Sequence, residues 1–490
     1  MEQGNQIQSA SAHLSQRVSD LTLLLTQTVD ALAGGSPDLA RHAEQLRLMV
    51  TRPPRVAVVG RLKSGKSTLV NALTENLIAA TGALECTMAV SMYHNGAPAR
   101  AEIHTTDGQV IRVPLNNGPL NNLTVPVNQV DFVDQFLPNR RLQELTLIDT
   151  PGTATLTVEN EERTRRVLVD GQKDTRRASG WADCLVFLSD SAPREDEKRF
   201  LSQLGMTPLN TVGILSRADS FGSGAFGSID PLQHARQHAD SIQKRLMSTV
   251  QRTIPLSGLM AESALTGKVT GEVARNLSAL AHLDREGLLD LLEAEDPREI
   301  VPECSASIRD DLLDVMGEYG VFAGRRIAAE GGAPALVKWM VETSGVAELV
   351  HLLTGDITYF AVLQRAARML DVLDDLASNH PDLQHVRWVQ SVTLAQPGMH
   401  FVMLYRSYRN TYASTPDSRL LPLLRSAVTA GHPAETVNLP RETPVEQVRQ
   451  ALEDKIAEMQ QMSMSPLSAA EDEARERLLG SFQSALQATH

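Results

Sequence analysis

The sequence has 490 residues, of which 42% are hydrophobic and 21% are charged, and its formal net charge is −13. A chain of this length suggests two or three domains with ordinary apolar cores, and its composition excludes a disordered polymer. The acidic balance argues against general nucleic-acid binding, which needs a concentrated basic surface, so no nucleic-acid partner is expected.

The N-terminal stretch MEQGNQIQSASAHL has neither a basic segment nor an apolar one, which predicts no secretory signal. No run of about 18 uncharged apolar residues is visible, which predicts no ordinary transmembrane helix. Cys86, Cys184 and Cys304 are odd in number and far apart, as free thiols in a reducing compartment would be. We therefore expect a cytoplasmic protein, and any membrane role would be peripheral.

The chain opens with two predicted helices. Apolar residues recur at alternating steps of four and three through residues 14–32, which predicts an amphipathic helix. The segment GGSPDL ends this helix. Within that segment, Ser36 is expected to be the N-cap and Pro37 the first residue of a second helix that reaches about Val50. Because these helices, residues 1–52, precede a different kind of domain, we expect them to join a helical bundle with later parts of the chain.

Short apolar runs separated by turns occupy residues 53–268: RVAVVG, AVSMYHNG, LTLIDTPG, DCLVFLSD and NTVGILSRAD. Such strands alternating with helical stretches predict an α/β domain with a mainly parallel sheet. ARAEIHTTDGQVIRVPL departs from this pattern, because Asp107 and Gly108 between alternating apolar residues predict an antiparallel hairpin. The sheet is therefore expected to have an antiparallel edge.

Residues 269–490 lose the strand signals, and helical periodicity dominates, for example through residues 362–376 and 452–459. Breaks such as SNHPDL, LAQPGM and AGHPAETVNLPRETP divide this region into several helices. The pattern predicts an elongated all-α bundle into which the N-terminal helices pack.

The segment GRLKSGKS, which begins at Gly60, has the phosphate-binding pattern G-x4-G-K-[ST] between a predicted strand and a predicted helix. The glycines let backbone N–H groups curl around a β-phosphate, Lys66 supplies a charge to the β- and γ-phosphates, and Ser67 can place its hydroxyl on Mg²⁺. The helix N-terminus adds a partial positive charge. A chance glycine-rich turn is the alternative, and the flanking strand and helix argue against it.

Two further segments complete a nucleoside-triphosphate site. LTLIDTPG places Asp149 at the end of a buried strand, where it can hold Mg²⁺ through water, and Gly152 can offer its N–H to a γ-phosphate. Thr87, in TGALECTMAV, lies where the first switch of a GTPase offers a second hydroxyl to Mg²⁺. The alternative for Thr87 is a loop threonine that only satisfies a turn.

GILSRAD follows a predicted strand at the place where a GTPase presents its guanine-reading sequence, usually [NT]-K-x-D. Asp219 can accept from the guanine N1–H and N2–H₂ donors, and the stem of Arg217 can lie over the base. Ser216 departs from the usual Asn or Thr, so a charged turn, or an ATPase with the same phosphate loop, stays open. Ser257, in IPLSGLM, can support the base from a further loop.

These motifs, between an N-terminal helical pair and a long helical C-terminus, resemble those of the bacterial dynamin-like GTPases, in particular the isoniazid-inducible dynamin-like proteins of mycobacteria. The segment TSGVAELVHLL...FAVLQRAARMLDVLDDLA is similar to the neck and trunk helices of that family. The resemblance implies GTP and GDP as substrate and product, with Mg²⁺. It also implies self-association through GTPase domains or with a second dynamin-like protein, and coupling of nucleotide state to tethering, fusion or remodelling at the inner face of the plasma membrane.

The resemblance also implies roles for single residues. The nucleotide would be held by Gly60, Lys63, Ser64, Gly65, Lys66, Ser67, Thr68, Asp149, Gly152, Arg217, Asp219 and Ser257. The metal would be held by Ser67, Thr87 and Asp149, and the catalytic groups would be Lys63, Lys66, Ser67, Thr87 and Gly152.

The catalytic arrangement departs from related enzymes. Leu62 and Lys63 stand where many dynamins have a Gln-Ser pair, and Thr153 stands where small Ras-like GTPases have a water-orienting Gln. Hydrolysis would then rely on backbone groups, the Thr87 loop and added positive charge, for which Lys63 is a candidate if GTPase domains pair. The alternative for Lys63 is an ordinary exposed lysine. We expect slow basal turnover that rises with assembly.

Aromatic residues gather within residues 379–412 of a chain that is only 4% aromatic, and this segment is a candidate membrane tip: Trp388, Phe401, Tyr405 and Tyr408. Aromatic rings interleaved with arginines suit an anionic lipid interface. The alternative is that they form the core and rim of the bundle. Two functions stay open, a membrane-remodelling GTPase and a regulatory GTPase acting on a soluble partner, and the long helical arm favours the first.

Overall fold

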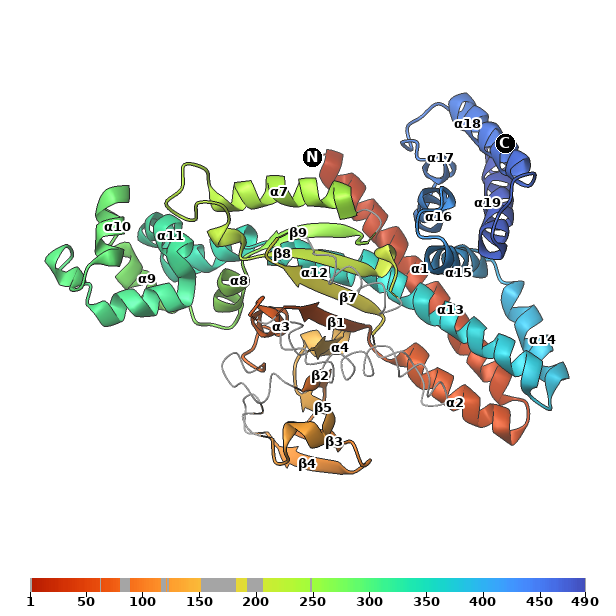
Figure 1. The fold of residues 1–490 in the computed structure, drawn as a ribbon, viewed down its shortest axis with the longest axis horizontal. Helices are drawn as coiled ribbons and strands as arrows, with labels where there is room; N and C mark the ends of the chain where they lie inside the picture. The colour runs from red at the N-terminus through yellow and green to blue at the C-terminus, as the bar shows by residue number, and fades with distance from the viewer. Residues whose placement is uncertain are drawn as a thin grey trace. The chain divides into compact units, whose positions relative to one another are not determined.

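The computed structural model describes residues 2–61, 63–79, 89–115, 120, 123–150, 182–191, 206–246 and 249–489 (Figure 1). The chain divides into two compact units. The helical unit consists of Met1–Pro54, Gly171–Asp183 and Gly355–His490. The sheet unit consists of Arg55–Asp170 and Cys184–Thr354.

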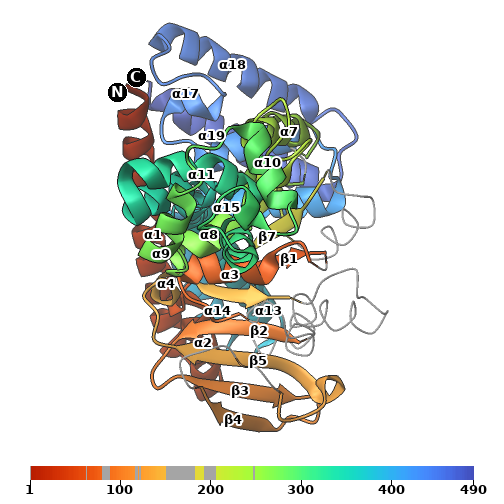
Figure 2. The same cartoon turned by 90° about the vertical axis from the view of Figure 1, so that its left-hand side faces the viewer.

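The sheet unit is built on one mixed sheet with the strand order β4-β3-β5-β2-β6-β1-β7-β8-β9. Figure 2 shows its edge with β4, β3, β5 and β2 side by side. The neighbours from β6 to β9 are parallel, whereas β2 is antiparallel to β6, and β3 is antiparallel to both β5 and β4. This confirms the predicted mainly parallel sheet with an antiparallel edge. The strands are β1 (Arg55–Gly60), β2 (Val90–Asn95), β3 (Arg100–Thr105), β4 (Val110–Pro114), β5 (Val130–Leu137), β6 (Thr146–Asp149), β7 (Cys184–Ser189), β8 (Thr211–Ser216) and β9 (Arg252–Leu256).

The antiparallel edge contains the predicted hairpin and one strand that the sequence did not reveal. In the hairpin Ile103 pairs with Ile111, and Gly108 has the positive φ of +85° that its turn requires. The unforeseen strand is β5, which lies between β3 and β2 and runs parallel to β2. Its Val133 packs in a small core with Ile103 and Leu120. The sequence VDFVDQFL carries two aspartates, which hid this strand from the apolar pattern.

The helices of the sheet unit are α3 (Lys66–Thr74), α4 (Arg141–Glu144), α7 (Pro231–Leu246), α8 (Gly258–Leu265), α9 (Gly271–Ser278), α10 (Arg285–Glu293), α11 (Ala306–Thr343) and α12 (Val346–Thr354). The helix α11 bends at Gly317 and Gly332, whose φ values are +66° and +64°. The sequence placed the end of the GTPase domain at residue 268, whereas the sheet unit continues to Thr354. The reason is a shared core, because Met260 of α8, Leu277 of α9 and Met316 of α11 belong to one apolar cluster.

The helical unit contains both ends of the chain. Its helix α1 packs along α2, α13 and α14. The second helix begins as expected, with the Ser36 side chain accepting from the Leu39 N–H and Pro37 in the first position. The helices are α1 (Glu2–Ala33), α2 (Pro37–Thr51), α13 (Asp356–Asn379), α14 (Leu383–Leu394), α15 (Met399–Ser414), α16 (Leu420–Thr429), α17 (Pro433–Thr436), α18 (Val445–Met462) and α19 (Ala469–Gln487).

One run in the described part of the chain, Val346–Asn379, has the length and composition of a membrane-spanning helix, with a mean hydropathy of 1.4. More than half of its most apolar window, 56%, is buried inside the structure, as in the core helices of water-soluble proteins. Gly355 interrupts the helical geometry between α12 and α13.

Two residues of the predicted membrane tip are in the core instead. Tyr405 is 0% exposed and Tyr408 is 3% exposed. The Tyr405 hydroxyl donates to Gln364 Oε1 on α13 at 2.9 Å. Of the other two, Phe401 is partly buried and Trp388 is 52% exposed. The correction has a simple cause, since α15 packs between α13, α16 and α19, so its aromatic stripe fills the bundle.

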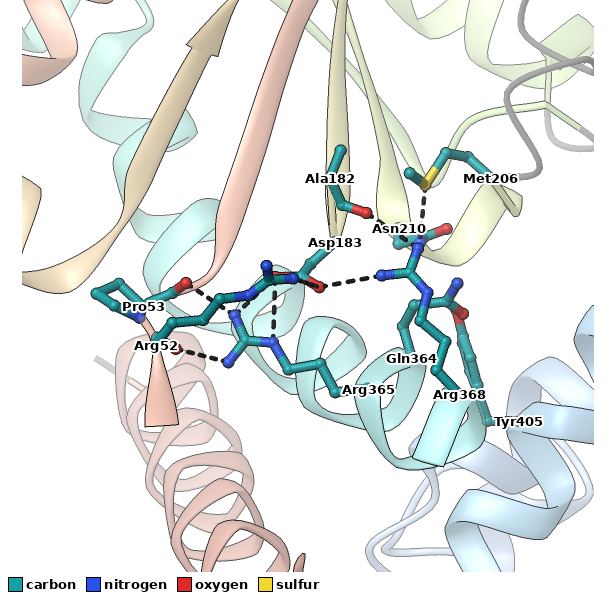
Figure 3. A network of polar contacts seen from close by, with 10 residues as sticks. All are labelled: Arg52, Pro53, Ala182, Asp183, Met206, Asn210, Gln364, Arg365, Arg368 and Tyr405. Carbon is teal, nitrogen blue, oxygen red and sulfur yellow. Dashed lines mark hydrogen bonds and ion pairs between the residues drawn. The ribbon is translucent and has the colours of Figure 1, made fainter. Parts of the chain in front are cut away.

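A buried ion cluster lies in the helical unit around Asp183, which is 0% exposed (Figure 3). Arg365 of α13 donates to Asp183 Oδ2 from Nη2 at 2.6 Å and from Nε at 3.1 Å. Arg52 and Arg368 each lie 3.4 Å from Oδ1. Burial alone would raise the pKa of Asp183, but the charges of Arg365 and Arg52 outweigh it and hold that pKa far below its usual range.

Arg365 also reaches the chain just before β1. Its Nη1 donates to the Arg52 carbonyl at 2.7 Å, and its Nη2 donates to the Pro53 carbonyl at 2.8 Å. Asp183 is the residue immediately before β7. One guanidinium therefore binds Arg52, Pro53 and Asp183 to α13 within the helical unit.

Candidate nucleotide-binding site

The loop between β1 and α3 is shaped by glycines. Gly65 is the N-cap of α3 and has a φ of +94°, a left-handed backbone conformation that glycine adopts without strain. At Gly60 a side chain cannot fit, because a Cβ would lie 2.6 Å from the carbonyl oxygen of Leu188 in β7. The backbone N–H groups at the start of α3 follow directly, as an anion site at a helix N-terminus requires.

Three of the predicted phosphate and metal residues, Lys66, Ser67 and Asp149, lie at this loop. Lys66 is 7% exposed, and its Nζ donates to the carbonyls of Gly60 at 3.2 Å and Arg61 at 2.9 Å. The Ser67 hydroxyl donates to Asp149 Oδ2 at 2.9 Å. The parallel pairing of β1 with β6 brings these two motifs together, although 82 residues separate Ser67 from Asp149.

Asp149 has the properties of a metal ligand. Its Oδ1 is buried and has no hydrogen-bond partner among the described residues. Burial raises the pKa of Asp149 and lowers the pKa of Lys66. The charge of each residue partly counteracts the shift of the other. A free carboxylate oxygen beside the Ser67 hydroxyl fits Mg²⁺, which prefers oxygen ligands and retains waters. When bound between these two residues, Mg²⁺ would neutralise phosphate charge.

The predicted base-reading residues also come together. Burial raises the pKa of Asp219, and the side chain of Ser257, which lies close to the Asp219 carboxylate, acts in the opposite direction. Ser257 is fully buried as the N-cap of α8. Arg217, exposed and with a φ of +55°, donates from Nη2 to the Lys63 carbonyl at 2.8 Å. This contact, which the sequence did not reveal, joins the base loop to the phosphate loop.

Some of the other candidate residues lie in the part of the chain that the structure describes, and some lie outside it. The Ser64 hydroxyl is buried without a hydrogen-bond partner among the described residues. Thr68 lies beside α8, within 3.6 Å of where a Cβ on Gly258 would be. Lys63 is exposed and has a φ of +61°. Thr87 and Gly152 lie outside the described residues, as do Cys86, Leu62 and Thr153.

A buried asparagine that sequence reasoning missed holds the end of α3. Asn71 is 0% exposed and accepts at Oδ1 from the N–H groups of Ile78, at 2.9 Å, and Ala79, at 2.7 Å. Its Nδ2 donates to Glu262 Oε1 of α8 at 2.7 Å, and Lys268 donates to the other Glu262 oxygen at 2.7 Å. The available signal was a polar residue within the apolar run LVNAL. Asn71 therefore fixes the chain that leads toward residue 80 and the Thr87 segment.

Replacing Asn71 with alanine is expected to lower the free energy of unfolding by about 2–4 kcal/mol, because several buried polar groups lose their partner. Asn76→Ala is the matched control, since Asn76 is exposed near the same helix end, and its effect should stay within about 0.5 kcal/mol. Urea unfolding followed by circular dichroism measures both. Equal unfolding midpoints for the two variants would contradict the role given to Asn71.

Residues 55–214 match the family described as 50S ribosome-binding GTPase. Together with the phosphate loop, the Ser67–Asp149 pair and the parallel sheet, this match defines a P-loop GTPase domain. The chain is also similar to isoniazid-induced protein IniC of Mycobacterium tuberculosis, at 31% identity over 327 residues, in each of two strains. The match covers 63% of this chain and 64% of IniC, which is less than two thirds of that relative's length. The resemblance to the isoniazid-induced proteins of mycobacteria is confirmed.

Two solved chains of an oligomerised bacterial dynamin pair, described as a mechanism for the long-range sensing and tethering of membranes, also align with this chain. The first is 12% identical with a TM-score of 0.37, and the alignment covers 98% of this chain and 74% of that one. The second is 13% identical with a TM-score of 0.32 and covers 98% and 66%.

Proposed function

We propose that this protein is a dynamin-like GTPase that binds and hydrolyses GTP with Mg²⁺. The observation that carries the proposal is the 2.9 Å hydrogen bond from the Ser67 hydroxyl to Asp149, beside the desolvated Lys66 at the start of α3. The lysine would bind phosphate oxygens, and the serine and aspartate would hold the metal. The pair of Asp219 and Ser257 supports recognition of guanine.

Self-association would supply the charge that the single site lacks. Lys63 is exposed on the phosphate loop, so a partner GTPase domain or a second dynamin-like protein could bring it near the γ-phosphate. GTP turnover per molecule should then rise with protein concentration. A flat value across a wide dilution series, with liposomes present, would count against this part of the proposal.

The proposed membrane role is peripheral binding to anionic lipid at the inner, cytoplasmic face of the plasma membrane. The support is an apolar group on α14, where Trp388, Val392 and Leu394 are 52%, 43% and 46% exposed. Arg387 beside them is also exposed. A tryptophan with a neighbouring arginine suits the headgroup region.

The substitution Trp388→Ser is expected to weaken co-sedimentation with phosphatidylglycerol vesicles about 5- to 30-fold, because burying half of a large aromatic side chain contributes about 1–2 kcal/mol. The control is Val445→Ser, which changes a side chain that is 54% exposed on α18 and should leave vesicle binding unchanged. Vesicle binding by Trp388→Ser equal to that of the unmodified protein would exclude α14 as the membrane element.

The alternative is a regulatory GTPase that acts on a soluble partner without remodelling a membrane. The observation in its favour is the description of the matching family, which names ribosome binding. GTP turnover that is intact in a protein with no vesicle association would favour this alternative.

A further inference from the structure

An open cavity of about 250 Å³ lies in the helical unit and is lined by residues of α1, α15, α16, α17 and α19 and of the chain just before α17. Its wall combines apolar side chains with several polar ones. The side chains that matter are those of Arg17, His400, Phe401, His432, Thr436 and Ser481.

Arg17 has no carboxylate partner among the residues that the structure describes. Its guanidinium lies 3.9 Å above the Phe401 ring, and its Nη2 donates to the Ala430 carbonyl at 2.7 Å. Its Nη1 is buried and makes no hydrogen bond among the described residues, although the Tyr359 hydroxyl lies close enough to interact with the guanidinium. The nearby Tyr359 hydroxyl does not supply a negative charge, because burial raises the pKa of Tyr359 to about 12 despite the opposing charge of Arg17. A half-buried guanidinium whose partners in the described part of the chain are all neutral favours an anion.

The rest of the wall offers further hydrogen-bond donors. Thr436 and Ser481 are 5% and 6% exposed, and each carries a hydroxyl. His432 accepts the Ala434 N–H at Nδ1, at 3.3 Å, so in its neutral form the proton is on Nε2, which can donate. Burial is the main cause that lowers the pKa of His400, and the nearby positive charges of Arg477 and Arg17 act in the same direction.

The acidic side chain of Glu435, next to this cavity, already has hydrogen-bond and ion-pair partners of its own. Glu435 accepts from the backbone N–H groups of Gly431, at 2.7 Å, and His432, at 3.1 Å. It also forms an ion pair with Arg441 at 2.5 Å. These contacts hold the pKa of Glu435 below its usual value despite partial burial, which acts in the opposite direction. Glu435 therefore has its own partners and does not pair with Arg17.

We propose that this cavity binds the phosphate group of a small anionic molecule. A guanidinium with surrounding O–H and imidazole N–H donors matches the three or four oxygens of a phosphate group. The volume, about 250 Å³, corresponds to roughly eight water molecules at liquid density, enough for a phosphate with a short ester group. The phosphate can belong to a soluble ester or to a lipid headgroup, and both present the same chemistry.

Calorimetric titration with glycerol 3-phosphate tests the site in a Lys66→Ala background, which weakens phosphate binding at the nucleotide loop. Arg17→Gln is expected to weaken the affinity at least about tenfold, because a charge-assisted hydrogen bond contributes about 1.5–3 kcal/mol. The matched control is Arg41→Gln, at an arginine whose side chain is 79% exposed on α2, and it should leave the affinity unchanged. Equal affinity in Arg17→Gln and its parent overturns the proposal.

A second variant tests the site independently if Arg17→Gln does not fold. Thr436→Val keeps the side-chain shape and removes one donor, so the affinity should fall several-fold with an unchanged circular dichroism spectrum. Full affinity in a folded Thr436→Val and a folded Arg17→Gln is inconsistent with a phosphate site.

Vesicle co-sedimentation distinguishes the two sources of phosphate. Arg17→Gln should reduce binding to phosphatidylglycerol vesicles if the ligand is a lipid headgroup, and should leave it unchanged if the ligand is a soluble ester. Either outcome supports the site when glycerol 3-phosphate binding depends on Arg17. The test does not require GTP hydrolysis, so it can fail while the proposed GTPase activity stands.

Discussion

Replacing Asp183 with asparagine is expected to lower the free energy of unfolding by about 3–5 kcal/mol, because the change removes the negative charge on which three arginines converge. The remaining guanidiniums would stay buried around a neutral amide. Asp30→Asn is the control, since Asp30 pairs with Arg47 at 2.8 Å but its side chain is 58% exposed, and its effect should be below about 1 kcal/mol. Urea unfolding of both variants provides the comparison.

The pKa of Asp183 gives this prediction a pH signature. Because the pKa is lower in the folded protein than in the unfolded chain, the stabilisation is present at neutral pH and is lost as the pH falls below about 4, the pKa of an unfolded aspartate. The asparagine variant should therefore lose less stability between about pH 5 and pH 3 than the unmodified protein. Parallel pH profiles would show that Asp183 is not held as an ion in the folded state.

Lys66→Ala is expected to weaken GTP binding by roughly 100-fold or more. In the proposed complex Lys66 makes charge-assisted hydrogen bonds to two phosphates, each worth about 1.5–3 kcal/mol, and each 1.4 kcal/mol is about tenfold in affinity. Equilibrium binding of a fluorescent GTP analogue measures the loss. Lys338→Ala is the control, because the Lys338 side chain is 76% exposed on α11. Unchanged GTP affinity in Lys66→Ala would contradict the proposed role of the phosphate loop in GTP binding.

The nucleotide motifs could be predicted because their chemistry is local. The spacing from Gly60 to Ser67 fixes one loop between one strand and one helix, so the phosphate site was readable without any long-range contact. The strand that ends at Asp149 could be predicted from its apolar run. The hydrogen bond between Ser67 and Asp149 then follows from the rule that the carboxyl ends of parallel strands meet at one edge of a sheet.

The sequence-based predictions that were wrong concern contacts between segments that are distant in the chain. Arg406 and Arg409 look like headgroup ligands in the sequence, but Asp371 of α13 pairs with Arg409 at 2.8 Å and with Arg406 at 3.0 Å. Helical periodicity shows that α15 has an apolar face, but it does not show which helix covers that face. The Asp183 cluster was hidden for the same reason, because 182 residues separate Asp183 from Arg365.

The central claim, a GTP-specific P-loop enzyme, is tested most directly by steady-state turnover of GTP and ATP by the purified protein with Mg²⁺, beside Lys66→Ala. We expect turnover of GTP that is lost in Lys66→Ala, and ATP turnover at least about 100-fold lower, because adenine cannot satisfy the Asp219 carboxylate. Equal turnover of ATP and GTP, or a Lys66→Ala variant as active as its parent, would contradict the account.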